Sequence, residues 1–203
     1  MRHETYRVVS FEKLAFLVAT VALFVVLTGC LMVSQYKFSF DFQTGEVRRE
    51  YYDIASKPAP DEKDYSIEKD WAALKQLAEE KKAEFDPDVV EDISRELFAE
   101  GSVLSGRKLH KIKCPKCFPS KAAILSYLHE KDWRFELVHD EVMLILPAGK
   151  KVVSTNGQSV ATAGNSVIVW PRESSKFEYV VSEPFSGGTS LLPYYLKQRA
   201  GPK

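Results

Sequence analysis

The chain has 203 residues, of which 28 are basic and 28 acidic, and 45% are apolar. This composition is that of a folded protein and excludes a chain that is disordered throughout. The zero formal net charge argues against a general nucleic-acid binder, and three cysteines are too few for a disulfide-dense secreted domain.

The N-terminal region contains an uncharged apolar run of 20 residues from Leu14 to Val33. A helix of this length spans about 30 Å, the hydrocarbon thickness of a bilayer. The run therefore predicts one transmembrane helix over residues 14–33, after a short cytoplasmic tail over residues 1–13. Two alternatives stay open: a cleaved signal peptide, or a lipoprotein signal, because the Leu-Thr-Gly-Cys sequence ending at Cys30 fits the bacterial lipobox.

The charges around the apolar run give the expected orientation. Arg2, Arg7 and Lys13 precede it, and an N-terminal anchor with a short basic tail usually leaves that tail in the cytoplasm. We therefore expect residues 34–203 on the outer side of the cytoplasmic membrane, with the lipid bilayer as the first partner.

A β-hairpin is predicted where the chain leaves the membrane. Phe38, Phe40 and Phe42 alternate with polar residues, as on one face of a strand, and a Gln-Thr-Gly turn follows them. We assign residues 34–52 to this juxtamembrane hairpin. The proline-containing residues 53–64 are expected to form a linker.

Three helices are predicted next. Ser66 caps the first, whose apolar positions recur at helical spacing: Ile67, Trp71, Leu74, Leu77 and Ala78. The second is predicted between Asp88 and Gly101, with apolar positions Val89, Val90, Ile93, Leu97 and Phe98. The third is expected over residues 120–131.

The rest of the chain as far as residue 182 is predicted to be β-rich. His139-Asp140-Glu141 is expected to form a hairpin turn, and Asn156-Gly157 is the strongest short hairpin signal in the sequence. The strands expected around and after these turns cover residues 135–138, 142–146, 151–154, 158–162, 167–170 and 177–181.

These elements predict an α+β fold in which helices come first and an antiparallel sheet follows, over residues 65–182. The Gly-, Pro- and Ser-rich residues 183–203 are expected to form a surface tail.

Cys114-Pro115-Lys116-Cys117 is the one motif with chemical content. The CPxC spacing resembles the dithiol of glutaredoxin-like oxidoreductases, and the order strand, CxxC, helix, strand resembles the start of a thioredoxin-like fold. This resemblance implies Cys114 as nucleophile and Cys117 as resolving thiol, with Lys113 and Lys116 favouring the thiolate. A structural pair and a zinc site that includes His110 are the alternatives, but a second CxxC is absent from the sequence. No cofactor is expected.

Charge is distributed unevenly along the chain. Residues 53–100 carry a net charge of −8 and residues 101–135 carry +6. The basic patch is expected either to pack near the acidic helices or to contact lipid headgroups or an acidic partner. Its members are Arg107, Lys108, Lys111, Lys113, Lys116 and Lys121.

The leading hypothesis is a membrane-anchored, non-enzymatic interaction or scaffold module of a bacterial-type cell envelope. Its partner would be an envelope protein or a second copy of the chain, and nucleic acid is not expected. The alternatives are a membrane-tethered thiol–disulfide oxidoreductase and a lipoprotein anchored at Cys30.

Overall fold

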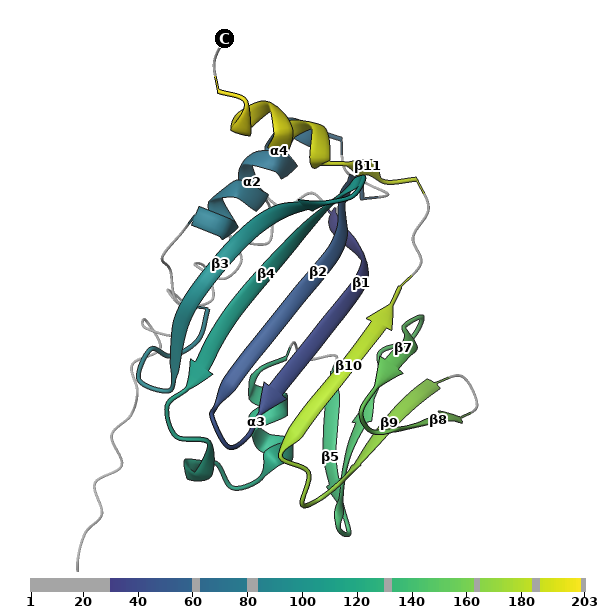
Figure 1. Cartoon of the computed structure of the whole chain (residues 1–203). Coiled ribbons are helices and arrows are strands. Elements are labelled where there is room, and N and C mark those ends of the chain that lie inside the picture. Colours follow the sequence, from purple (N-terminus) through teal and green to yellow (C-terminus); the bar gives the residue numbers. More distant parts are fainter. Residues whose placement is uncertain are drawn as a thin grey trace, which may run out of the picture.

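The computed structural model in Figure 1 describes most of the chain after the N-terminal apolar run. The described residues are 30–59, 63–79, 84–129, 133–162, 165–183 and 187–201. Within these ranges the protein is α+β, with antiparallel sheets and three α-helices, as the sequence predicts at this coarse level.

The larger sheet has seven strands in the order β3-β4-β2-β1-β10-β7, and β11 pairs with β2. Each neighbouring pair is antiparallel. The strands are β1 (Cys30–Asp41), β2 (Glu46–Lys57), β3 (Val90–Glu100), β4 (Val103–Ile112), β7 (Lys151–Thr155), β10 (Lys176–Ser182) and β11 (Thr189–Ser190).

The smaller sheet has four antiparallel strands in the order β5-β6-β9-β8. They are β5 (Arg134–Val138), β6 (Glu141–Ile145), β9 (Asn165–Pro171) and β8 (Gln158–Thr162). A short 3₁₀ helix, η1 (Pro115–Cys117), and helix α3 (Lys121–Tyr127) connect β4 of the larger sheet to β5 of the smaller one. Ser120 caps α3, because its hydroxyl accepts a hydrogen bond from the Ala123 N–H at 3.1 Å.

The main hydrophobic core lies between one face of the larger sheet, α3 and the smaller sheet. Alternate residues of β1 point into it, as the phenylalanine pattern predicts. The following core side chains are no more than 2% exposed: Phe38, Phe40, Val47, Phe177 and Tyr179 of the larger sheet, Ile124, Leu125 and Leu128 at α3, and Leu144, Ile168 and Trp170 of the smaller sheet.

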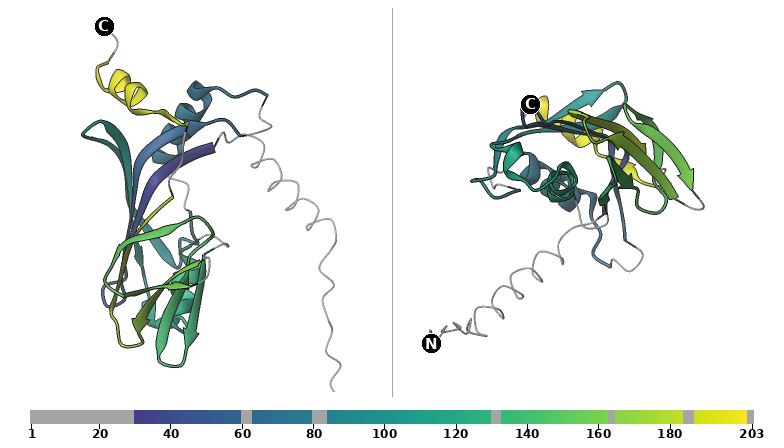
Figure 2. Two further views of the ribbon diagram at one scale, coloured as in Figure 1. Left: turned by 90° about the vertical axis from the view of Figure 1, so that its right-hand side faces the viewer. Right: turned by 90° about the horizontal axis from the view of Figure 1, so that it is seen from below.

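A second, smaller core lies at the other end of the larger sheet. There α2 (Ile67–Glu79) and α4 (Leu192–Arg199) pack against β1, β2 and β4, and both helices are seen at the top of Figure 1. Its buried members are Ile54, Leu74, Leu104 and Leu191. The strands of the larger sheet bend along their length, as Figure 2 shows.

The hairpin predicted after the membrane segment is confirmed, but it is longer and more central than expected. Residues 53–57, expected in a linker, belong to β2, and residues 30–33, expected in the membrane helix, belong to β1 and pair with residues 54–57. The two strands occupy the middle of the larger sheet instead of a separate juxtamembrane unit, because both edges of the hairpin pair with further strands, β1 with β10 and β2 with β4. The rest of the predicted membrane segment, residues 14–29, lies outside the described residues.

The helix predicted between Asp88 and Gly101 is wrong, because these residues form the edge strand β3. The pairing with β4 shifts between Asp92 and Ser94, so the strand contains a bulge, and Ile93 there is 52% exposed. One extra residue breaks the two-residue alternation and produces spacings that imitate a helix. Gly101 lies in the turn to β4 instead of ending a helix.

The hairpin predicted at Asn156-Gly157 is also wrong. β7 pairs with β10 in the larger sheet, whereas β8 pairs with β9 in the smaller one, so these two residues carry the chain from one sheet to the other. Asn156 fixes this corner: its Oδ1 accepts hydrogen bonds from Trp170 Nε1 and from the Glu178 N–H. β9 and β10 also belong to different sheets, β9 to the smaller one and β10 to the larger one.

Part of the predicted surface tail is built into the fold. Ser190 pairs with Ala55 of β2, and the Leu191 side chain is 0% exposed. Three other predicted elements are confirmed near their expected places. Helix α2 begins at Ile67, helix α3 follows Ser120, and His139-Asp140 forms the turn between β5 and β6. The expected order of helices followed by one sheet does not hold, since β1 and β2 precede α2.

A substitution at Gly157 tests the close packing where the chain passes from one sheet to the other. A Cβ atom at this position would lie 2.6 Å from Trp170 Nε1 and 2.7 Å from the Val169 carbonyl oxygen, closer than real side chains approach. Gly157→Ala should therefore lower the free energy of unfolding by about 1–3 kcal/mol, measured by urea denaturation. The exposed Ser159→Ala two residues later should change it by less than about 0.5 kcal/mol. Equal stability of the two variants would contradict the close contact.

Candidate functional site

The inner face of the larger sheet carries a groove between its two covered ends. The groove consists of two adjoining cavities that share four lining residues: Val33, Tyr51, Lys108 and Lys150. We call the cavity beside α2 the apolar arm, the cavity beside α3 the aromatic arm, and the four shared residues the waist.

The apolar arm has a volume of about 470 Å³. Aliphatic residues of three elements line it: Leu31 of β1, Ile54 of β2, and Leu74, Leu77 and Ala78 of α2. Leu74 of the predicted apolar stripe is buried, but Leu77 is 46% exposed, so α2 presents one apolar side chain of this stripe to the open space. Volume and lining are those of a pocket for a small or extended apolar group, for which about 300–1,000 Å³ is usual.

The aromatic arm has a volume of about 290 Å³ and is lined by rings from four parts of the chain. The Tyr36 ring centroid lies 5.3 Å from that of Tyr51 and 5.5 Å from that of Trp133. His129 lies 5.3 Å from Trp133 and also bonds to Tyr179 through Nε2. These offset and edge contacts hold the wall of the arm in one arrangement.

The waist places two lysines on opposite sides of the groove. Lys108 Nζ bonds to Glu84 at 2.8 Å and lies 5.9 Å from the Tyr51 ring centroid. Lys150 Nζ bonds to Glu183 and lies 5.8 Å from the Trp133 ring centroid. Apart from Arg107 and Glu96, which pair with each other on the outer face, the lining of both arms contains four basic and two acidic residues, so the groove has a net positive charge.

Arg49 closes the floor of the aromatic arm and is 4% exposed. Its guanidinium donates to Glu84 Oε1 at 2.5 Å and to the Leu128 carbonyl oxygen, and it lies 5.0 Å from the centroid of the Phe85 ring. Burial raises the pKa of Glu84, but the charges of Arg49 and Lys108 outweigh it and hold that pKa at about 2. Both members of the pair are therefore ionised at neutral pH.

A break in the strand alternation brings the floor of the groove together. Val47, Arg49 and Tyr51 follow the two-residue period of β2, whereas Ile54 reaches the groove three positions after Tyr51. Asp53 lies between them with a φ of 55°, a left-handed conformation that asparagine and aspartate adopt more readily than most residues. This residue turns Ile54 toward α2 and allows both arms to lie on one face.

His110 is buried next to this site and has no hydrogen bond among the described residues. Its side chain is 1% exposed, both ring nitrogens lack a partner, and the Phe85 ring lies against it with centroids 5.5 Å apart. Asp92 Oδ1 is 3.6 Å from Nδ1, beyond hydrogen-bond distance. Burial lowers the pKa of His110 to about 4, so the ring is neutral at pH 7.

The outer face of the larger sheet carries a separate, compact charge network around Glu50, which is 2% exposed. Burial raises the pKa of Glu50, but hydrogen bonds from Arg48, Tyr52 and Arg107 outweigh this effect and hold it at about 2. The distances are 2.5 Å to Arg48 Nη2, 2.9 Å to the Tyr52 hydroxyl and 2.8 Å to Arg107 Nε. All of these groups satisfy one another, which is typical of a structural network.

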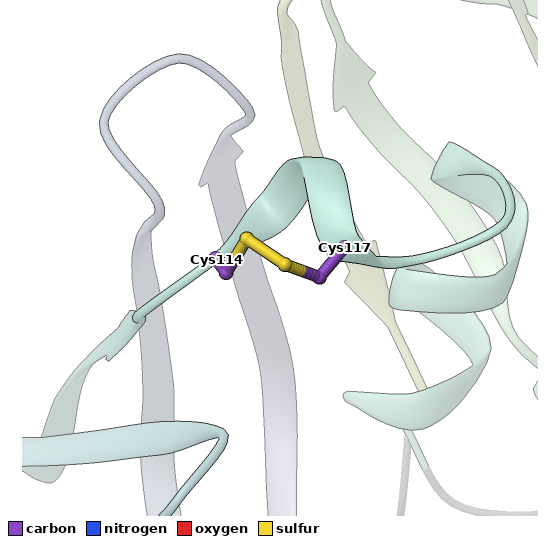
Figure 3. The surroundings of a disulfide bond; sticks show 2 residues. All are labelled: Cys114 and Cys117. Carbon is purple, nitrogen blue, oxygen red and sulfur yellow. A yellow bond between two sulfur atoms is a disulfide. The ribbon is translucent and has the colours of Figure 1, made fainter.

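Cys114 and Cys117 form a disulfide across η1, which Figure 3 shows. Both residues are exposed, as are Lys113 and Lys116. The surroundings differ from a thioredoxin-like fold, in which the flanking strands are parallel in one sheet: here β4 and β5 belong to different sheets. Within the described residues, no group of three potential ligands is placed to hold a metal, so His110 and the cysteine pair do not form such a group.

The six residues of the basic patch do not act as one surface. Arg107 pairs with Glu50 and Glu96, Lys108 pairs with Glu84, and Lys121 donates to the carbonyl oxygens of Arg172 and Ser174. Lys111, Lys113 and Lys116 are exposed. Arg107 and Lys108 have partners in the acidic segment, but Glu96 belongs to strand β3 and Glu84 follows α2, so neither partner lies in a helix.

Most residues that line the groove are not predicted from the sequence. Arg49, Tyr36, Glu84, Trp133 and Lys150 were not selected as candidates, and of the waist residues only Lys108 was selected. One signal was available, because Arg49 lies between Val47 and Tyr51 on the inner face of the predicted second strand. A charged residue in the buried register of a strand indicates a partnered internal site.

Comparison with protein families, curated proteins and solved structures finds no match to this chain. Among the residues that the structure describes, no helix is long and apolar enough to cross a membrane. The position of Cys30 as the first residue of β1 is described, and the lipoprotein and transmembrane alternatives both stay predictions.

The Arg49–Glu84 pair provides a test of the groove floor. Glu84→Gln removes the negative charge and leaves the guanidinium buried beside a neutral amide. Because Glu84 is one-third exposed, we expect a loss of about 2 kcal/mol in the free energy of unfolding, below the usual range for a fully buried pair. In the control Glu79→Gln, the exposed Lys75–Glu79 pair is lost, and the change should stay under about 0.5 kcal/mol.

The buried histidine predicts a pH dependence of stability. The folded-state pKa of His110, about 4, lies below its ordinary value of 6.5, so the unfolded chain binds more protons between these values. The contribution of His110 is fully present above pH 6.5 and is lost as the pH falls toward 4, by roughly 3 kcal/mol. The charges of Arg49, Glu84, Asp92 and Lys108 all act on its ring.

Urea denaturation at several pH values measures this effect. His110→Phe should make the curve less steep between pH 6.5 and 4, and the remaining slope includes His129, whose pKa burial lowers to about 3. His139→Asn, at an exposed turn position, is the control. Curves of the same slope for the wild type and His110→Phe would show that His110 does not titrate as the structure requires.

Proposed function

We propose that this chain is a membrane-tethered, non-enzymatic interaction module of a bacterial-type cell envelope, and that it holds its partner in the groove. The observation that supports this proposal is the groove itself: an apolar arm and an aromatic arm joined on one face of a sheet whose two ends are already covered. Folding alone does not require apolar side chains such as Leu77 to face open space, and a partner gives them a role.

The electrostatics of the groove support binding rather than proton transfer. Its carboxylates and cations are paired with one another, as Lys108 is with Glu84 and Lys150 is with Glu183. A general base needs a free group with a pKa near the working pH, whereas the pKa of Glu84 is held at about 2. Fixed, paired charges beside apolar walls orient a bound molecule without reacting with it.

The tether is proposed from the apolar residues that precede β1. Residues 14–29 are uncharged, and the groove-lining Leu31 and Val33 follow them closely in the sequence. The domain would then work at the outer surface of the cytoplasmic membrane. Protease protection of residues 34–203 in intact cells, together with its loss after the outer membrane is opened, tests this side of the proposal, and intact mass distinguishes a lipid on Cys30 from an uncleaved helix.

A photo-crosslinking residue in place of Leu77 tests the groove in the membranes of intact cells. Leu77 lines the apolar arm and is exposed, so the substituted side chain points toward whatever occupies the groove. We expect a covalent adduct at this position and none when the same residue replaces Ala72, which is exposed on α2 but does not line either arm. Adducts of equal yield at both positions, or at neither, would contradict the groove as the interaction site.

A further inference from the structure

The two arms of the groove differ in chemistry along its length. The apolar arm is walled by aliphatic side chains, among them Leu31, Leu74 and Leu77. The waist follows with Lys108 and Lys150, and the aromatic arm beyond it contains Arg49. A molecule that matches this order has an extended hydrocarbon part and, next to it, an anionic group.

From this order we infer that the groove binds one acyl chain of an anionic membrane lipid, with the phosphate at the waist between Lys108 and Lys150. The inference rests on the proposed function, in which the groove is the interaction site. Hydrocarbon of the ligand would lie against α2 and the start of β1, where burial of apolar area stabilises the complex. The phosphate would meet the net positive charge of the lining, where four basic residues face two acidic ones once the outer-face pair of Arg107 and Glu96 is left out.

The position of the apolar arm in the chain points to the membrane as the source of the lipid. Val33 lines the arm and lies four residues after Gly29, the last residue before β1. A strand rises about 3.3 Å per residue, so no more than about 13 Å of chain separates them. If residues 14–29 enter the bilayer as predicted, the open side of the apolar arm lies within reach of its outer leaflet.

Paired lysines are compatible with this ligand. Lys108 and Lys150 are 24% and 20% exposed, so each retains contact with solvent on the groove side while bonding to Glu84 or Glu183. A phosphate accepts further hydrogen bonds from ammonium groups, each of which has three donors. The rings of Tyr51 and Trp133 lie under the two lysines and exclude water from one side of the site.

Photolabelling in proteoliposomes tests the inference with the full chain. The vesicles are of phosphatidylcholine with a minor fraction of phosphatidylglycerol that carries a diazirine at the end of one acyl chain, and parallel vesicles contain phosphatidylcholine with the same diazirine. Mass spectrometry then maps the label. We expect the anionic probe to label α2 and residues 31–33 about tenfold more than the neutral probe does. Label on residues 14–29, which either lipid can reach in the bilayer, is the internal reference.

Two sets of variants separate the charge from the cavity. Lys108→Gln with Lys150→Gln should reduce groove labelling by the anionic probe to the level of the neutral one, and Lys150→Gln alone should reduce it in part. Lys111→Gln with Lys113→Gln removes the same charge from exposed positions and should leave labelling unchanged. Ala78→Trp fills the apolar arm and should abolish groove labelling, whereas Ala72→Trp on the exposed face of α2 should not.

The outcomes are distinct. Equal groove labelling by both probes, or labelling that survives the double lysine variant in a folded protein, overturns the anionic lipid. Groove labelling no stronger in the wild type than in Ala78→Trp overturns a lipid occupant altogether. If a crosslinker at position 77 still captures a protein while lipid labelling fails, the proposed function stands and this inference does not. Thermal unfolding of each variant confirms that loss of labelling is not loss of fold.

Discussion

The buried guanidinium of Arg49 connects the three parts of the chain that meet at the groove. It projects from β2, bonds to the Leu128 carbonyl oxygen at the end of α3, and pairs with Glu84 in the segment that follows α2. The Phe85 ring covers its face. Because a buried charge without partners is costly, the position of Arg49 determines where these two segments can approach the sheet. The groove is the space that remains between them.

This constraint explains why the inner face of the larger sheet is not covered along its whole length. The main core ends near Leu128 and the smaller core begins near Leu74, and each is complete with its own helices. The left-handed Asp53 turns the end of β2 toward the smaller core, so the two cores share one continuous sheet but not one set of side chains. Because the same sheet packs against two separate cores, a gap remains between them where the side-chain alternation of β2 is broken at Asp53.

Sequence patterns predicted those elements in which local and tertiary preferences agree. The alternating phenylalanines of β1 and the helical stripe of α2 were correct because each faces one core in a regular register. The failures have the opposite cause. The bulge at Ile93 gives the apolar residues of strand β3 a spacing that resembles that of a helix. Asn156-Gly157 connects the two sheets instead of two paired strands, because Trp170 Nε1 and the Glu178 N–H donate hydrogen bonds to the Asn156 oxygen.

The groove was harder to predict than the fold because its residues come together only through non-local contacts. Tyr36 and Trp133 are almost 100 residues apart in the sequence, and Glu84 reaches Arg49 only after α2 has packed. No motif of fixed spacing identifies such a set. The Cys114-Pro115-Lys116-Cys117 motif, which has a recognisable spacing, instead lies on the surface in the connection between the two sheets. The motif and the candidate groove are therefore in different parts of the molecule.

The start of β1 connects the structure to the predicted anchor. An apolar segment that ended in a flexible tether would leave the domain free to move away from the bilayer, and a groove for lipid would then have no fixed relation to its source. Here the chain passes from the uncharged run into a strand at the centre of the larger sheet, with Leu31 and Val33 already paired to β2. If residues 14–29 anchor the chain as proposed, the strand that follows them also lines the groove, and one element would then set both the position of the domain and the access of the proposed lipid.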